Sequence, residues 1–426
     1  MADTTPPTPE APDDDPLNRG GIGCPWTVGR RLGLWGTEGP PPGTPGNQPP
    51  AYDYGPVFQR VRRRLPKLVQ QVHQRRQEAV AHLAELRGLP PEERRRALKD
   101  PRFRNPALVE LLLETSGAVQ RREPGESEEL AGLAAALAAR TEPTPDDLAA
   151  IFARSLGLAA NARRLRGEHR AAEVALEQAV PFLAQAADWG AFCRGLGLLR
   201  WEQGRLHPAA ALFDHAAALF QKEKLAPEQG DCLALLGLLL TEAAAYASAL
   251  PILGAALAVL ETRRRPWLAV RARLALALTL AETGQAKVAR QTRAEAWRDY
   301  RWLDREDDLL PLQWLGGQIA ARLREREAGA LLDAVGQESQ RQGRLAETAL
   351  MALDWSRTLP KPRRAGELAV RTAEMAEAFA GRKGLERVLG RLRESAGGTE
   401  SRTAAAAGLR RALRAGGIGP APLPFV

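Results

Sequence analysis

Apolar and polar positions follow one another along most of the chain at the spacing of amphipathic helices. In residues 56–87 aliphatic side chains recur three or four positions apart, which predicts one or two helices, with a kink or division at Pro66. Residues 89–103 predict a loop, a short helix and a stop before Pro101. Two further helices are predicted at about 106–119 and 127–140.

From about residue 150 the helical pattern becomes periodic. Small or turn-forming positions separate pairs of Ala/Leu-rich segments at spacings of 37, 40, 40, 39 and 40 residues, and they fall at Gly167, Gly204, Ala244, Gly284, Leu323 and Arg363. A steady period of this length predicts a solenoid of stacked helix pairs.

The repeated units share an internal pattern that explains how two helices meet. Eight and seven residues before the turn stand Leu196-Gly197, Leu236-Gly237, Leu276-Ala277 and Leu315-Gly316. An alanine follows five residues after it, at Ala172, Ala209, Ala249, Ala289 and Ala328, and a larger residue nine after it, at Leu176, Phe213, Leu253 and Leu332. Small residues allow antiparallel helices to approach closely, and the larger residues fill the space between units. Arg293 occupies the large position of the fourth unit.

This pattern resembles the tetratricopeptide repeat (TPR), and Gly204 through Ala216 match it well. The resemblance covers about residues 150–380, although Ala244, Leu323 and Arg363 replace the turn glycine, and the period exceeds the usual one of about 34 residues. The segments YDYGPVFQRV (52–61), PPEERRRALKDPRFRNPALVELLLETS (90–116), PLQWLGGQIAARL (311–323) and TAEMAEAF (372–379) look like those of an uncharacterised group of bacterial TPR proteins. The resemblance implies an all-α, right-handed TPR-like superhelix and transfers no activity.

Composition divides the chain into four parts. Residues 1–50 hold 12 of the 32 prolines and nine of the 39 glycines, so a disordered tail is predicted there. Residues 51–140 form an N-terminal helical region, residues 141–395 the solenoid, and residues 396–426 a flexible tail with room for a short helix.

Several function classes find no support in the sequence. The chain has no phosphate-binding GxxxxGK[ST] motif, and none of its five histidines has zinc-ligand spacing, so we expect no cofactor, no metal and no enzymatic activity. Three cysteines, including Cys24, without a CxxC pair favour a reducing cytoplasm. No apolar run is long enough to span a bilayer, and we expect no membrane partner. The sequence leaves the oligomeric state open.

A basic stretch stands out against the net charge of +9. Seven basic residues and no acid lie within 17 positions: Arg60, Arg62, Arg63, Arg64, Lys67, Arg75 and Arg76. Such a cluster fits an acidic protein or a phosphate backbone. We favour the protein, or a solvated face, because no nucleic-acid recognition module accompanies it. A nucleic-acid-associated regulator that uses this stretch and the C-terminal tail is the alternative.

The function that the repeats predict is protein interaction. Helical solenoids present a concave face, built mainly by the first helix of each unit, which commonly holds peptides or partner domains. The candidate contact residues on those helices are Asn161, Arg164, Arg200, Trp201, Arg271 and Gln318. Trp201 also has the helical spacing of a packing residue between units. We therefore expect a scaffold or adaptor that binds a peptide or protein, in bacterial regulation or signalling.

Overall fold

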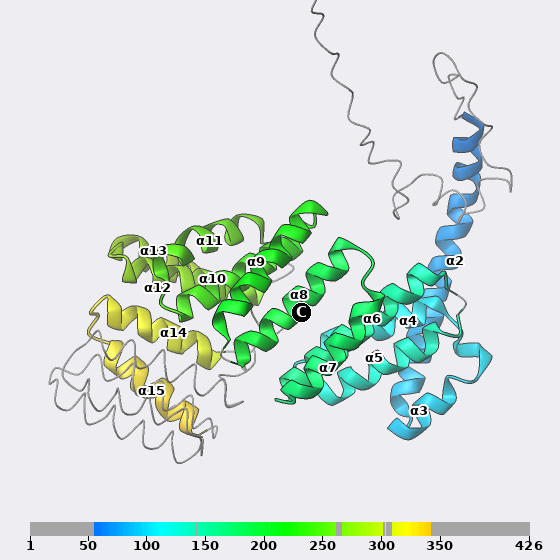
Figure 1. Ribbon diagram of the computed structural model, residues 1–426, viewed down its shortest axis with the longest axis horizontal. Helices are drawn as coiled ribbons and strands as arrows, with labels where there is room; N and C mark the ends of the chain where they lie inside the picture. The colour runs from blue at the N-terminus through cyan, green and yellow to red at the C-terminus, as the bar shows by residue number, and fades with distance from the viewer. Residues whose placement is uncertain are drawn as a thin grey trace, which may run out of the picture. The chain divides into compact units, whose positions relative to one another are not determined.

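The computed structural model describes residues 55–141, 143–203, 205–260, 266–300, 303 and 309–341. The predicted tails 1–50 and 396–426, and the predicted turn at Arg363, lie outside the described residues. The chain divides into two compact units, residues 1–81 and 82–426. Everything described is helix, turn or loop, and the helices are drawn as ribbons in Figure 1.

The N-terminal helices begin where proline and capping residues start them. Helix α2 runs from Gly55 to Gly88 as one continuous helix that contains Pro66. It is followed by α3 (Pro91–Ala97), the short 3₁₀ helix η1 (Pro101–Phe103), α4 (Pro106–Val119) and α5 (Pro124–Ala138). Proline at the first helical position carries no N–H that would lack a partner. At α4 the Asn105 side chain also accepts a hydrogen bond from the Ala107 amide at 2.9 Å.

Five helix pairs continue the chain. They are α6 (Pro145–Leu165) with α7 (His169–Ala179), α8 (Ala186–Glu202) with α9 (Leu206–Lys222), α10 (Ala226–Glu242) with α11 (Tyr246–Val259), α12 (Pro266–Glu282) with α13 (Ala286–Tyr300), and α14 (Leu309–Arg322) with α15 (Ala328–Arg341). A 3₁₀ helix, η2 (Val180–Phe182), follows α7. Helices within a pair pack together, and α4 packs with α5 in the same way.

The first helices of most successive pairs contact one another, whereas the α8–α9 pair meets the next pair mainly through α9 and α10. Helix α4 contacts α6, α6 contacts α8, α10 contacts α12, and α12 contacts α14. We call α4, α6, α8, α10, α12 and α14 the first helices. Helix α5 also packs against α6, so the pairing continues without a break across residues 140 and 141.

The turns use a left-handed backbone in the four pairs whose turn residue the structure describes; the predicted turn residue Gly204 lies outside the described residues. Gly167 has φ +77°, Ala244 +59° and Gly284 +84°, at the positions that the sequence predicts. In the last described pair the left-handed residue is Arg324, with φ +56°, and the predicted Leu323 lies one position too early. With Arg324 the spacing from Gly284 is 40 residues, equal to that between Ala244 and Gly284.

Glycines make the seam within three of the five pairs, and two of these glycines lie where the sequence predicts them. A Cβ at Gly197 would lie 2.7 Å from the Phe213 ring, and one at Gly237 would lie 2.5 Å from Leu253. In α14 the residue in this role is Gly317, whose Cβ would lie 2.7 Å from Leu332, and the predicted Gly316 instead faces Trp297. This shift of one residue matches the shift of the turn to Arg324.

Alanines and larger residues of the pattern form the core. The alanines five residues after the predicted turn are all at most 2% exposed: Ala172, Ala209, Ala249, Ala289 and Ala328. Phe213 and Leu253 are fully buried. At the corresponding position of the fourth unit Arg293 donates hydrogen bonds to Glu325 at 2.7 and 3.1 Å, so an ion pair replaces apolar packing there.

Candidate binding site

A pocket of about 350 Å³ opens between three first helices, α4, α6 and α8. Its apolar walls come from Leu113, Leu158, Leu176, Leu183 and Phe192. Ligand pockets of proteins typically combine mostly apolar walls of this kind with a few fixed polar groups. The hollow is therefore of a size and lining that suit a bound side chain or a small molecule.

Glycines on each of the three helices leave the space open. Gly117, Gly157 and Gly195 all line the pocket. A Cβ at Gly157 would meet no atom within 4 Å, and one at Gly195 would lie 3.6 Å from Leu176. Glycine costs helix stability relative to alanine. The glycine in α6 leaves a cavity open, whereas the glycines between paired helices, such as Gly197 and Gly237, allow those helices to pack closely.

Charged side chains stand around the apolar walls. Arg154 on α6 pairs with Glu110 on α4 at 2.9 Å. Arg194 on α8 lies 3.5 Å from Asp231 on α10, and its guanidinium is 5.8 Å from the Phe220 ring centre. Asp188 accepts a hydrogen bond from the Gln185 amide in the capping box that starts α8. The pocket thus offers both signs of charge beside apolar surface.

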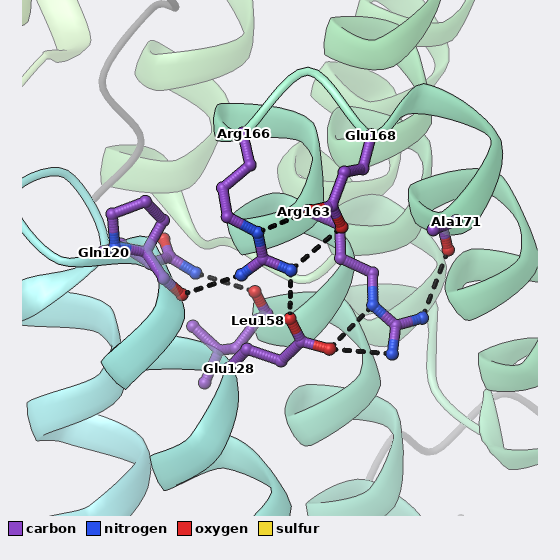
Figure 2. Close-up of polar contacts among 8 residues, drawn as sticks. Gln120, Glu128, Leu158, Arg163, Arg166, Glu168 and Ala171 are labelled. Carbon is purple, nitrogen blue, oxygen red and sulfur yellow. Dashed lines mark hydrogen bonds and ion pairs between the residues drawn. The ribbon is translucent and has the colours of Figure 1, made fainter.

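A chain of hydrogen bonds fixes the polar groups at one end of the pocket. Gln120, which is 2% exposed, donates to the Leu158 carbonyl at 3.0 Å, as Figure 2 shows. Asn161 donates its side-chain amide to Gln120 Oε1 at 2.7 Å, and Arg164 donates to Asn161 Oδ1 at 2.9 Å. Both atoms of the Asn161 amide are therefore oriented before any ligand arrives.

Arg164 extends this hydrogen-bond network into the protein interior. Its side chain is 2% exposed and pairs with Glu202 at the end of α8. Burial lowers the pKa of Arg164, and the Glu202 carboxylate opposes that shift. His169 Nε2 lies 3.5 Å from the second oxygen of Glu202. Arg164 and Glu202 together hold α6 against α8 beside the pocket.

A second polar cluster secures α5 against the turn between α6 and α7 (Figure 2). Glu128 accepts hydrogen bonds from both Arg163 and Arg166, one on each oxygen. Arg166 also bonds both oxygens of Glu168 at 2.9 Å. The hydrogen bond from Arg166 lowers the pKa of Glu168, and its bonds to Glu168 and Glu128 raise the pKa of Arg166. Arg163 donates in addition to the Ala171 carbonyl at 3.3 Å.

Asn161 and Arg164 are the predicted contact residues that meet at the pocket. Asn161 lines it, and Arg164 does not line it but donates to Asn161 Oδ1 in the network just described. Arg200 is half-buried at the end of α8, where it pairs with Glu173 and donates to Gln203 at 2.8 Å. Trp201 is 1% exposed and donates to Glu242 at 3.1 Å, so its indole packs between units.

The other two predicted contact residues lie on later first helices. Arg271 on α12 is half-buried, with its guanidinium 5.2 Å from the Trp267 ring centre. The guanidinium of Arg121, from the turn after α4, lies 5.6 Å from the same ring. Gln318 is half-buried on α14. These positions belong to the same series of helices as Asn161 but do not line its pocket.

Gln120, which lines the pocket, and Trp189, which contacts a residue of the pocket wall, were missed from the sequence. Gln120, at the end of α4, orients Asn161 from 41 residues away, close to one repeat period. Trp189, in the first turn of α8, is 38% exposed, and its ring centre lies 5.8 Å from that of Phe192 in the pocket wall. The available signal was an aromatic residue at the start of a first helix, next to the capping residue Asp188.

The basic stretch lies in the first compact unit. Arg62, Arg64, Lys67, Arg75 and Arg76 are exposed on α2. The side chains of Arg60 and Arg63 lie outside the described part of the chain. Among the described residues no group of three or more His, Cys, Asp or Glu side chains suits a metal ion. No helix within those residues is long and apolar enough to cross a membrane.

No protein-family model and no curated protein matches this chain. Among solved structures, the chain is similar to a Rap protein complexed with competence and sporulation factor, with a TM-score of 0.50, 12% identity, and coverage of 70% of this chain and 85% of the Rap chain. It also resembles the Rap conjugation gene regulator of plasmid pLS20 in complex with the Phr* peptide, with a TM-score of 0.42, 12% identity, and coverage of 68% and 93%. The first likeness, together with the helix pairs, establishes an all-α, TPR-like helical-repeat fold.

Proposed function

We propose that this protein is an adaptor that binds a peptide, or an exposed segment of a partner protein, on its first helices. The pocket between α4, α6 and α8 is the subsite that takes an apolar anchor side chain of that peptide. The observation that carries this proposal is an apolar hollow of about 350 Å³ beside the oriented amide of Asn161.

The chemistry of the pocket supports a peptide as ligand. Leu158, Leu176 and Phe192 offer apolar surface to a side chain, whereas the Asn161 amide suits the N–H and C=O groups of a main chain. Trp189 and Arg194 stand beside the same walls, and both types are frequent in the energetically dominant parts of interfaces. The fold supports the proposal too, since the similar Rap protein is complexed with competence and sporulation factor.

The predicted contact residues take different parts in this proposal. Asn161 contacts the ligand, and Arg164 positions Asn161 from below. Trp201 positions Glu242 at the end of α10. Arg200, Arg271 and Gln318 extend the interaction along the later first helices. We place this adaptor in bacterial regulation or signalling, as a binding protein and not a catalyst. A location in the cytoplasm agrees with the two buried free cysteines, Cys193 and Cys232.

A variant that fills the pocket tests the proposal. Leucine in place of Gly157 extends from an open helical position into the hollow, because a Cβ there meets no atom within 4 Å. Gly254→Leu is the matched control, since Gly254 is an exposed glycine of α11 with equally open surroundings. A phage-displayed library of random peptides is selected on the full-length protein, and enriched peptides are synthesised for fluorescence anisotropy.

Enriched peptides that share an aliphatic or aromatic residue, and that lose at least about tenfold in affinity for Gly157→Leu but not for Gly254→Leu, support the pocket as the anchor subsite. Asn161→Ala is expected to weaken the same peptides. Equal affinity for both glycine variants would show that the peptide anchors elsewhere and would overturn this assignment.

A further inference from the structure

Helix α2 presents a stripe of aliphatic side chains to solvent. Leu65 is 50% exposed, Val69 59% and Val72 65%. Their spacing of four and three residues places them on one face of the helix. Scattered apolar residues on a surface need no explanation, but a row of neighbours on one helical face is typical of an interaction surface.

Basic residues continue and flank the stripe. Arg62 stands three residues before Leu65 and Arg76 four after Val72, so the row from 62 to 76 alternates steps of three and four residues. This alternation is the pattern of a seam between two packed helices. Arg64, Lys67 and Arg75 are exposed along the same segment, and the first acid of the helix is Glu78.

The basic side chains of this face limit which kind of partner can bind α2. A second copy of α2 would bring one basic seam against another, and like charges repel. A nucleic acid would match the positive charge of the arginines but leave Leu65, Val69 and Val72 in water, because its backbone offers no aliphatic surface. A partner helix with an apolar stripe and with glutamate or aspartate beside that stripe complements both the aliphatic side chains and the basic side chains of α2.

We propose that this face of α2 binds an acidic amphipathic helix of a partner protein. The apolar stripe of the partner packs on Leu65, Val69 and Val72, and its carboxylates pair with Arg62, Arg75 and Arg76. This surface belongs to residues 1–81, whereas the pocket belongs to residues 82–426, so the inference does not depend on the function proposed for the pocket.

The test uses the full-length protein and a fluorescein-labelled 21-residue synthetic helix. The peptide carries leucines at alternating steps of three and four residues and glutamates on both sides of them. A scrambled peptide of the same composition keeps the charge and loses the stripe. Binding is measured by fluorescence anisotropy at several salt concentrations, since pairing between exposed charges weakens as salt is added.

The expected result is saturable binding of the striped peptide that is at least about tenfold tighter than binding of the scrambled peptide. The double variant V69N/V72N should lose a similar factor, whereas V288N should not, because Val288 is a comparably exposed valine on α13. The double variant R75Q/R76Q should weaken binding and flatten its dependence on salt. All substituted side chains are exposed, so we expect each variant to retain the fold.

Three outcomes would overturn the inference. Equal binding of the striped and scrambled peptides would show that charge alone attracts them. Tighter binding of a 20-base-pair DNA duplex than of the striped peptide, with loss in R75Q/R76Q but not in V69N/V72N, would assign the face to nucleic acid. A dimer of the unmodified protein that V69N/V72N converts to a monomer in sedimentation velocity would assign it to a second copy of the chain.

Discussion

Gly197 on α8 lies so close to Phe213 on α9 that a Cβ at position 197 would be 2.7 Å from the phenyl ring. Phe213 is fully buried and has little freedom to move away. We therefore expect Gly197→Ala to lower the free energy of unfolding by about 1–3 kcal/mol, the usual cost of overpacking a core. The measurement is the urea midpoint followed by circular dichroism.

The control for this substitution is Gly132→Ala on α5. Gly132 is exposed in the middle of a helix, and a Cβ there meets no atom within 4 Å. Alanine should raise the stability at this position by about 0.5–1 kcal/mol, because it forms helix better than glycine. If both substitutions raised the midpoint equally, the seam between α8 and α9 would be less tightly packed than described.

This seam is the part of the fold that the sequence predicts best. The packing partners of Gly197 and Gly237 and of the alanines after each turn lie within about 20 positions in the sequence. The spacing of these small residues therefore predicts which side chains pack together. The prediction is one residue too early at the last described turn, whereas the turn at Ala244, which also lacks glycine, lies where the sequence predicts it. At Leu323 and Arg324 neither side chain marks the left-handed position, and only the backbone identifies Arg324.

The pocket was harder to predict because it depends on contacts between units. Asn161 was a candidate from its place on a first helix, but its partner Gln120 directly follows α4, in the part that the sequence assigns to a separate N-terminal region. The burial of Arg164 and Trp201 also follows from stacking and not from local pattern. The spacing of apolar residues locates helical faces, but it does not reveal which charged groups of two helices meet.

The left-handed turn at Ala244 predicts a stabilising substitution. Ala244 has φ +59°, where a Cβ costs about 1–2 kcal/mol, and glycine avoids that cost. Glycine also loses more backbone entropy on folding, by up to about 1 kcal/mol. Ala244→Gly should therefore raise the free energy of unfolding by up to about 1 kcal/mol in thermal or urea unfolding.

The reverse change at Gly284 is the matched control. Gly284 has φ +84° at the equivalent turn, and Gly284→Ala should destabilise the protein by about 1 kcal/mol. Ala243→Gly, one residue before the left-handed position, should also destabilise, because Ala243 has right-handed backbone angles. A loss of stability in Ala244→Gly would contradict the conformation described for this turn.

The buried pair of Arg164 and Glu202 predicts a large effect that a second substitution reverses. Arg164 is 2% exposed, so Glu202→Gln leaves a buried guanidinium without its carboxylate. We expect a loss of about 3–5 kcal/mol. Adding Arg164→Met removes the buried charge and should restore much of that loss. A double variant no more stable than Glu202→Gln would contradict the ion pair as the source of the effect.

The ion pair of Glu173 with Arg200 at the end of α8 gives a prediction for the dependence of stability on pH. Glu173 on α7 accepts a hydrogen bond from Arg200, and this bond, followed by the attraction of the same guanidinium, lowers the pKa of Glu173. Its contribution to stability is therefore complete above the usual pKa of about 4.3 and is lost as the pH falls through the lowered value.

Glu173→Gln removes this contribution at every pH. The urea midpoint of the unmodified protein should exceed that of Glu173→Gln at pH 7, and the difference should shrink toward zero as the pH falls below about 4. Other carboxylates titrate alike in both proteins and cancel from the difference. Added salt should reduce the difference at pH 7, since both side chains of the pair are partly accessible to solvent. A difference that stays constant from pH 7 to pH 3 would mean that Glu173 acts through packing and not through its charge.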